Sequence, residues 1–289
     1  MHLTIFDVQH GACALVTCDN GDRIMVDCGH SGPNDWRPGN YLVERGISNL
    51  ELLIITNYDE DHVSGLPNLR EKVKVEYLLL NKTVTPETLT ELKREHGMGS
   101  GITELVAMAK RYTGNYDAEV APTYPRVKRT VFKNSYPEFK DENNLSLVVN
   151  LEIAGINILF PGDLEKAGWK ALLESDADFR ETVSKVDFLI ASHHGRENGK
   201  YEPLFTDYGC EPHLVIISDK QYEHESQETV QFYADQAKGF LVNDRDRYVL
   251  TTRNDGCIRF EFEATDRVCN IYANFDMTQE TKVRKVRLI

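Results

Sequence analysis

The sequence predicts an α/β protein in which helices cover β-sheets. Short apolar runs typical of strands alternate with stretches of helical spacing through both halves of the 289-residue chain. Strands and helices mixed in this way favour sheets with helices packed against them. The sequence holds no internal repeat, proline-rich linker or low-complexity run. We therefore expect a single domain over residues 1–289.

Composition excludes several classes of protein. With 41% hydrophobic and 27% charged residues, the chain has an ordinary globular composition. Its longest apolar runs, Leu52–Ile55 and Phe188–Ala191, are far shorter than the roughly 18 residues of a membrane-spanning helix. The first residues lack the basic start and apolar stretch of a secretory signal. We expect a cytoplasmic protein without a membrane partner.

The net charge of −13 limits the choice of partners, because such a surface repels nucleic acid and anionic membranes. A polyanion would need a metal ion or a local basic patch. The sequence has two local basic segments, and each is also typical of a solvated strand face or a terminal tail. The first contains Arg126, Lys128, Arg129 and Lys133, and the second contains Lys282, Arg284, Lys285 and Arg287. The six cysteines occur singly, which predicts reduced thiols.

The first third of the chain predicts an antiparallel start followed by a buried strand. Asp19–Gly21 supplies a tight hairpin turn between the second and third of three short strands. The continuous apolar run Leu52–Ile55 is typical of a strand that is buried on both faces. The predicted strands are His2–Val8, Gly11–Cys18, Arg23–Val26 and Leu52–Ile55, and a helix is predicted over Pro38–Arg45.

The rest of the chain alternates helices with strands. Its first two predicted helices flank the glycine-rich segment Gly97–Gly101, which is either a mobile lid or, more simply, a connector. The predicted helices are Pro86–Glu95, Thr103–Tyr112, Glu165–Glu174 and Glu228–Ala237. The predicted strands are Leu145–Ile153, Ile156–Phe160, Val186–Ala191, Leu214–Ile217, Tyr248–Thr252, Cys257–Phe262 and Val268–Ala273.

The clearest chemical signal follows the buried strand, in the segment Asp59–His62. Asp59 and Asp61 are two residues apart, and His62 adjoins the second carboxylate. Carboxylate oxygens and imidazole nitrogens bind divalent metal ions, and strand ends are where α/β proteins build their sites. Taken alone, the segment is equally typical of an acidic turn with a helix N-cap.

Three later features favour the metal site. Asp163 leaves an apolar strand at a point where an unpaired buried charge is costly. His193 and His194 follow another apolar strand. On an extended chain, adjacent side chains point in opposite directions, so at most one of the two faces a given metal ion. His224 lies in a loop beyond the strand that ends at Ile217.

Together these motifs resemble those of the metallo-β-lactamase fold hydrolases, and most closely the C-terminal nuclease-like domain of ComEC-type competence proteins. The resemblance extends over about residues 3–261. The corresponding segments are Phe6–Gly11 (FDVQHG), Thr56–His62 (TNYDEDH), Asn143–Val148 (NNLSLV), Pro161–Glu165 (PGDLE) and His193–Gly195 (HHG). No single motif is specific, but their order and spacing are.

The resemblance implies an αββα four-layer sandwich with one or two divalent metal ions, Mn²⁺ or Zn²⁺, with Mg²⁺ a third candidate. Asp163 would bridge two metal sites. Asp61 and His62 would bind one ion, with His193 as a further ligand, and Asp59 would bind the other. Asn57 stands where the family usually has a histidine. Because an amide oxygen is a weak, hard ligand, we expect that site to prefer Mn²⁺ or Mg²⁺ over Zn²⁺, or to lack its metal.

The function implied by the resemblance is hydrolysis of a phosphodiester in nucleic acid or a nucleotide by a metal-activated water. Asp59 or Asp61 would orient the water, and His194 and His224 could each be a further metal ligand, a phosphate contact or the proton donor to the leaving group. Asp27 is interpreted as a supporting residue beside the site. Two alternatives stay open. One is a hydrolase of a lactone, thioester or other carbonyl compound, and the other is a degenerate protein with a binding or regulatory role.

Overall fold

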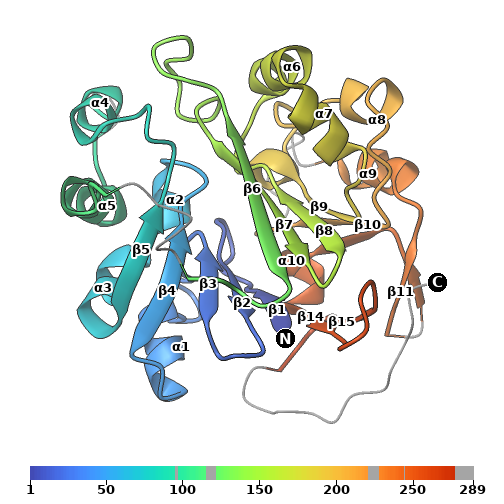
Figure 1. Cartoon of the computed structure of the whole chain (residues 1–289), viewed down its shortest axis with the longest axis horizontal. Helices are drawn as coiled ribbons and strands as arrows, with labels where there is room; N and C mark the ends of the chain where they lie inside the picture. The colour runs from blue at the N-terminus through green and yellow to red at the C-terminus, as the bar shows by residue number, and fades with distance from the viewer. Residues whose placement is uncertain (95–96, 115–121, 221–227, 244, 277–289) are drawn as a thin grey trace.

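The computed structural model describes residues 1–94, 97–114, 122–220, 228–243 and 245–276. Two β-sheets face each other at its centre (Figure 1). The first sheet has seven strands in the order β15-β14-β1-β2-β3-β4-β5. Strands β3, β4 and β5 are parallel, and the other neighbours are antiparallel. The bounds are β1 His2–Ile5, β2 Ala14–Thr17, β3 Arg23–Val26, β4 Asn49–Ile54, β5 Lys74–Leu79, β14 Ile258–Phe262 and β15 Cys269–Tyr272.

The second sheet has six strands in the order β13-β10-β9-β8-β7-β6. Strands β13, β10, β9 and β8 are parallel, whereas β7 pairs antiparallel with both β8 and β6. The bounds are β6 Val127–Lys133, β7 Leu147–Ile153, β8 Ile156–Phe160, β9 Phe188–Ile190, β10 Leu214–Ile217 and β13 Val249–Thr251. A separate hairpin pairs β11 (Phe240–Val242) with β12 (Arg245–Arg247).

One apolar core fills the space between the two sheets. Alternation along each strand sends every second side chain into this core. On β3, Ile24 and Val26 join it, whereas Met25 points to the outer face. On β7, Val149 joins it, whereas Val148 points outward. The two sheets are thus held together by burial of apolar area.

Helices cover the outer face of each sheet. Apolar side chains of α1 (Pro38–Glu44), α3 (Leu66–Lys72) and α5 (Ser100–Arg111) pack on the first sheet. Those of α6 (Lys166–Ser175), α7 (Ala177–Val183), α8 (Pro203–Thr206) and α9 (Val230–Gln236) pack on the second. The layers therefore follow the order αββα, as Figure 1 shows. The remaining helices are α2 (Glu60–Val63), α4 (Pro86–Leu92) and α10 (Thr252–Asp255).

Most predicted elements are present within a few residues of their expected ends. The hairpin at Asp19–Gly21 joins β2 and β3 as expected. Other elements were not predicted: β5, β6, β11, β12 and the helices α2, α3, α7, α8 and α10. The glycine-rich segment leads into α5, which begins at Ser100 rather than at the expected Thr103. The backbone N–H groups of Gly101 and Ile102 donate to the Glu60 carboxylate, at 2.7 and 3.1 Å.

The first basic segment lies on β6, the last strand of the second sheet, where Lys128 pairs with Glu152 at 2.8 Å. The second basic segment, at 282–287, lies outside the described residues. All six cysteines are free thiols, and only Cys257 is partly exposed. Among the described residues, no helix has the length and apolar character needed to span a membrane.

Candidate metal centre

His62 lies between two carboxylates, one from each sheet. Its Nδ1 is 3.0 Å from Asp27 Oδ2, and its Nε2 is 3.0 Å from Asp163 Oδ1. Asp27 follows β3 and is itself fixed, because the backbone N–H and the hydroxyl of Thr56 both donate to it. An imidazole that donates Nδ1–H to a carboxylate presents its Nε2 lone pair outward, which is the usual arrangement of a metal-binding histidine. Asp27 therefore has the supporting position inferred from the sequence.

His194 reaches the same place from the second sheet. It follows β9 in a tight turn in which both histidines have left-handed backbone angles, φ 49° at His193 and 54° at His194. The sequence argument assumed an extended backbone at these two histidines, and that assumption is wrong. His194 Nδ1 is 2.9 Å from the carbonyl oxygen of Ser218, so Nδ1 carries the hydrogen. Its Nε2 lies 3.1 Å from Asp61 Oδ2 and 3.6 Å from Asp163 Oδ2.

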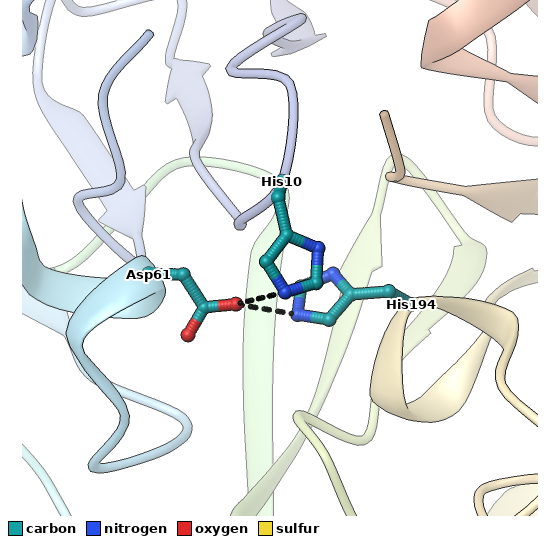
Figure 2. A group of neighbouring side chains, drawn as sticks. All are labelled: His10, Asp61 and His194. Atoms are coloured by element: carbon teal, nitrogen blue, oxygen red, sulfur yellow. Dashed lines mark ion pairs between the residues drawn. The ribbon is translucent and has the colours of Figure 1, made fainter. Parts of the chain in front are cut away.

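His10 is a residue of the centre that sequence reasoning missed. Figure 2 shows its ring beside Asp61 and His194, and His10 Nε2 is 3.3 Å from Asp61 Oδ2. His10 Nε2 is also 3.3 Å from an Nη of Arg196. The sequence held one signal, an imidazole inside the Phe6–Gly11 motif. Only the loop between β1 and β2 brings it to the centre, and no spacing rule predicts that contact.

Two glycines fix the position of the Asp61 backbone. A Cβ atom at Gly11 would lie 2.4 Å from the Asp61 carbonyl oxygen, and one at Gly29 would lie 2.5 Å from the same atom. Real Cβ contacts are never so short, so only glycine allows this approach. The backbone N–H of Ala12 and that of Cys28 also bind the segment, through the carbonyls of Asp61 and His62. The carboxylate of Asp61 is placed by main-chain packing.

Charge pairing dominates the ionisation of the centre. Burial alone would raise the pKa of Asp163, but the charges of His62 and His194 lower it to about 2. Burial likewise opposes charge on His62, and the carboxylates of Asp163 and Asp27 raise its pKa well above its usual value. The pKa of Asp61 falls below its usual range in the same way, through His194 and His62. The carboxylates are therefore ionised at neutral pH, as metal ligands must be.

The residues of the centre fit a divalent metal ion. Two groups of potential ligands each have their ligand atoms within 4.8 Å of one another. One is His62, Asp163 and His194, and the other is His10, Asp61 and His194. His194 Nε2 is buried and faces the carboxylates of Asp61 and Asp163, so a divalent ion could replace its proton between them. Imidazole nitrogens combined with carboxylate oxygens suit Zn²⁺ and Mn²⁺.

Other residues named from the sequence lie elsewhere. Asn57 is fully buried and donates to the side chains of Asn143 and Ser146. Asp59 Oδ1 is 2.5 Å from Lys93 Nζ. His193 is turned toward Glu165, with Nδ1 3.4 Å from Oε1. His224 lies outside the described residues.

The family model described as the metallo-beta-lactamase superfamily matches residues 7–196, which include every residue of this centre. The chain belongs to this superfamily. The resemblance found in the sequence is thereby confirmed, and so is the metallo-β-lactamase type of fold. Membership indicates a metal-dependent hydrolase.

The chain is also similar, at low sequence identity, to curated proteins and to solved structures. ComE operon protein 3 of Bacillus subtilis (strain 168) is 26% identical over 84% of the chain and 28% of the relative. The anti-Pycsar protein Apyc1 of Bacillus phage BSP38 is 28% identical over 51% of the chain and 59% of the relative. The chain thus spans less than two thirds of these relatives.

A putative Zn-dependent hydrolase of the superfamily from Thermotoga maritima shares 12% identity with a TM-score of 0.42. That structural match covers 86% of this chain and 97% of the other.

Proposed function

We propose that this metallo-beta-lactamase superfamily protein is a phosphodiesterase that acts on nucleic acid or a nucleotide. One observation carries the proposal: the cluster of carboxylates and imidazoles has a guanidinium at its edge. Arg196 approaches His10 at 3.3 Å, and its Nε is buried without a hydrogen-bond partner. A guanidinium that has one N–H without a partner beside a metal centre suits an anionic substrate, because guanidinium groups bind phosphate oxygens well.

The side chains divide the work as follows. Asp61, His62, Asp163 and His194 would hold the ion, which when bound supplies an acidified water and offsets phosphate charge. Asp27 and the Ser218 carbonyl keep the rings of His62 and His194 oriented. Asp61 would also orient the attacking water. His194 has Nδ1 on the Ser218 carbonyl and Nε2 on the ion, so His224 stays the candidate for proton transfer.

Arg196 and His10 lie at the partly exposed side of the cluster. The side chain of His10 is 31% exposed, whereas that of His194 is 3% exposed. A phosphate arriving from solvent would therefore meet His10 and Arg196 first. We propose that Arg196 binds its non-bridging oxygens. The net charge of −13 favours a nucleotide or a short strand over a long duplex, which needs many cationic contacts. A cytoplasmic site of action stays a prediction from the sequence.

The test is hydrolysis of bis(p-nitrophenyl) phosphate by metal-free protein after addition of Mn²⁺, Zn²⁺ or Mg²⁺. We expect metal-dependent turnover that is lost in Asp163→Asn. Arg196→Ala should raise KM for the phosphodiester, and Arg196→Lys should restore part of the loss. Lys128→Ala, on the far edge strand β6, should change neither constant.

Parallel assays with a lactone and a thioester separate the alternatives. Turnover of those substrates without phosphodiester cleavage would identify a carbonyl hydrolase. An absence of both bound metal and turnover would identify a binding or regulatory protein. Either result contradicts the proposal.

A further inference from the structure

Lys93 is a buried cation beside the metal centre. It follows α4 and is only 5% exposed. Its Nζ lies 2.5 Å from Asp59 Oδ1 and 3.1 Å from Glu142 Oε1. A buried ammonium is retained only where carboxylates offset its cost of desolvation, and these two do so. Three separate segments of the chain therefore converge on one positive charge.

Asn57 lies next to this ion pair, and all of its polar atoms are engaged. Its Nδ2 lies 3.2 Å from Asn143 Oδ1 and 3.1 Å from Ser146 Oγ. Its Oδ1 accepts the backbone N–H of Asp59 at 2.6 Å. An amide nitrogen has no lone pair available for a metal. The oxygen, which is the only metal-binding atom of this side chain, is used to shape its own loop.

The residues on this side therefore do not fit a second metal ion. Asn57 and Asp59 are the two positions at which the resemblance places that ion, together with the bridging Asp163. Asn57 faces a hydrogen-bond network, and Asp59 faces an ammonium. Asp163 has both carboxylate oxygens turned to His62 and His194, at 3.0 and 3.6 Å. All three side chains are directed away from a shared second site.

We propose that the ammonium of Lys93 takes the place of one of the two metal ions, so that the protein binds a single divalent cation. The cation lies among Asp61, His62, Asp163 and His194, so that the two ligand groups, which share His194, serve one ion. The inference rests on the metal-dependent function proposed above, and it deepens that function by fixing the number of ions and assigning a role to Lys93.

Electrostatics explains why the lysine excludes a second ion. A divalent cation at Asp59 would have to displace the ammonium or lie beside it, and two cations a few ångströms apart repel strongly in a poorly solvated site. Displacement would break the Asp59 ion pair and leave the buried Lys93 with Glu142 alone to offset its desolvation, which is itself costly. Unlike a metal ion, the ammonium is covalently attached and cannot be removed by a chelator. The positive charge beside Asp59 and Glu142 is therefore a fixed part of the protein.

The primary experiment measures metal stoichiometry. Metal-free protein is dialysed to equilibrium against Mn²⁺ and, separately, Zn²⁺, and bound metal is counted by plasma mass spectrometry. We expect one equivalent at saturation. Two equivalents in the native protein would overturn the inference and leave the phosphodiesterase proposal standing. No bound metal would overturn both.

Variants identify the responsible side chain. Lys93→Arg keeps the charge and should stay at one equivalent. Asn57→His combined with Lys93→Ala supplies a ligand and removes the cation, and should approach two. One equivalent in a folded double variant would contradict the role of Lys93. Circular dichroism and thermal melting establish which variants fold.

A second measurement does not depend on the double variant. Loss of a residue that supports a metal ligand typically raises the metal dissociation constant at least roughly 10-fold. If Asp59 pairs with Lys93 rather than with an ion, Asp59→Asn should raise this constant by less than that. A larger loss of affinity would show that Asp59 is a ligand. Calorimetric titration of both proteins decides between the two outcomes.

Discussion

The carbonyl oxygen of Ser218 fixes the tautomer of His194. The two atoms Nδ1 and O are 2.9 Å apart, and since a carbonyl can only accept, the ring hydrogen lies on Nδ1. Nε2 is then directed at Asp61 and Asp163, whose carboxylates raise the pKa of His194, and a bound metal ion would take the place of the Nε2 proton. His62 also carries a hydrogen on Nδ1, and there the acceptor is the Asp27 carboxylate instead of a carbonyl. Both imidazoles are prepared to bind one ion before it arrives.

Asp163→Asn and His62→Ala should each abolish most of the metal-dependent activity. Each removes a side chain that would contact the ion, and metal catalysis is worth several kcal/mol, so a loss of at least about 100-fold is expected. Turnover of bis(p-nitrophenyl) phosphate at saturating Mn²⁺ gives the activity, and bound metal is counted in the same samples. If either variant, folded by circular dichroism, turned over at the native rate, the assignment of these ligands would be wrong.

Asp27→Asn should weaken metal binding without removing a ligand. The amide is a poorer acceptor for His62 Nδ1–H and for the two Thr56 donors, so the ring loses both orientation and basicity. Loss of such a partner typically costs about 10- to 100-fold in affinity. Asp35→Asn is the matched control, since the Asp35 side chain is 87% exposed. Equal dissociation constants for Asp27→Asn and the native protein would contradict this role.

Gly29→Ala should displace Asp61, because a Cβ at that position would lie 2.5 Å from the Asp61 carbonyl oxygen. We expect weaker metal binding together with a lower melting temperature. Gly32→Ala, three residues along the same loop, is the control, since its Cβ would meet no atom within 4 Å. Identical melting and metal titration curves for the two variants would show that the close approach does not position the site.

His2 should make the folded state less stable in acid. Burial, Arg259 and the N-terminal amine lower the pKa of His2 to about 3, whereas its unfolded value is near 6.5. The unfolded chain therefore binds the proton first, so stability is complete above pH 6.5 and declines as the pH falls toward 3. The slope from one such group is at most about 1.4 kcal/mol per pH unit.

Urea unfolding between about pH 7.5 and about pH 5 measures this slope. His2→Gln should flatten the decline by about 2 kcal/mol over that interval, with pH 8 as the reference where both side chains are neutral. A decline as steep in the variant as in the native chain would assign it to other groups.

The layers of the fold could be predicted from the sequence better than the ligand set. Apolar runs such as Leu52–Ile55 and the Asp19–Gly21 turn carry local signals, and they determine strands and hairpins. Strand β5 was missed because its alternation is broken by Glu76 and Tyr77, which are half-buried. Asp61, His62 and Asp163 could be predicted because each lies in the segment that follows an apolar strand, β4 for the first two and β8 for the third.

His10, Lys93 and Arg196 could not be predicted, since they reach the site through contacts between distant segments. His10 and Arg196 are 186 residues apart in the chain. Lys93 lay in a stretch interpreted simply as a helix. The orientations of His193 and His194 could not be predicted either, because they depend on left-handed backbone angles that no pattern of residue types indicates.

The pairing of His62 with Asp163 joins residues 101 positions apart that follow different sheets. Neither sheet alone contains a complete set of ligands. A chain that is still being synthesised, or one in which the sheets have not yet stacked, therefore holds at most half of the centre. The complete set of metal ligands therefore forms only when both sheets have stacked. Incomplete or proteolysed fragments should have no metal-dependent hydrolase activity.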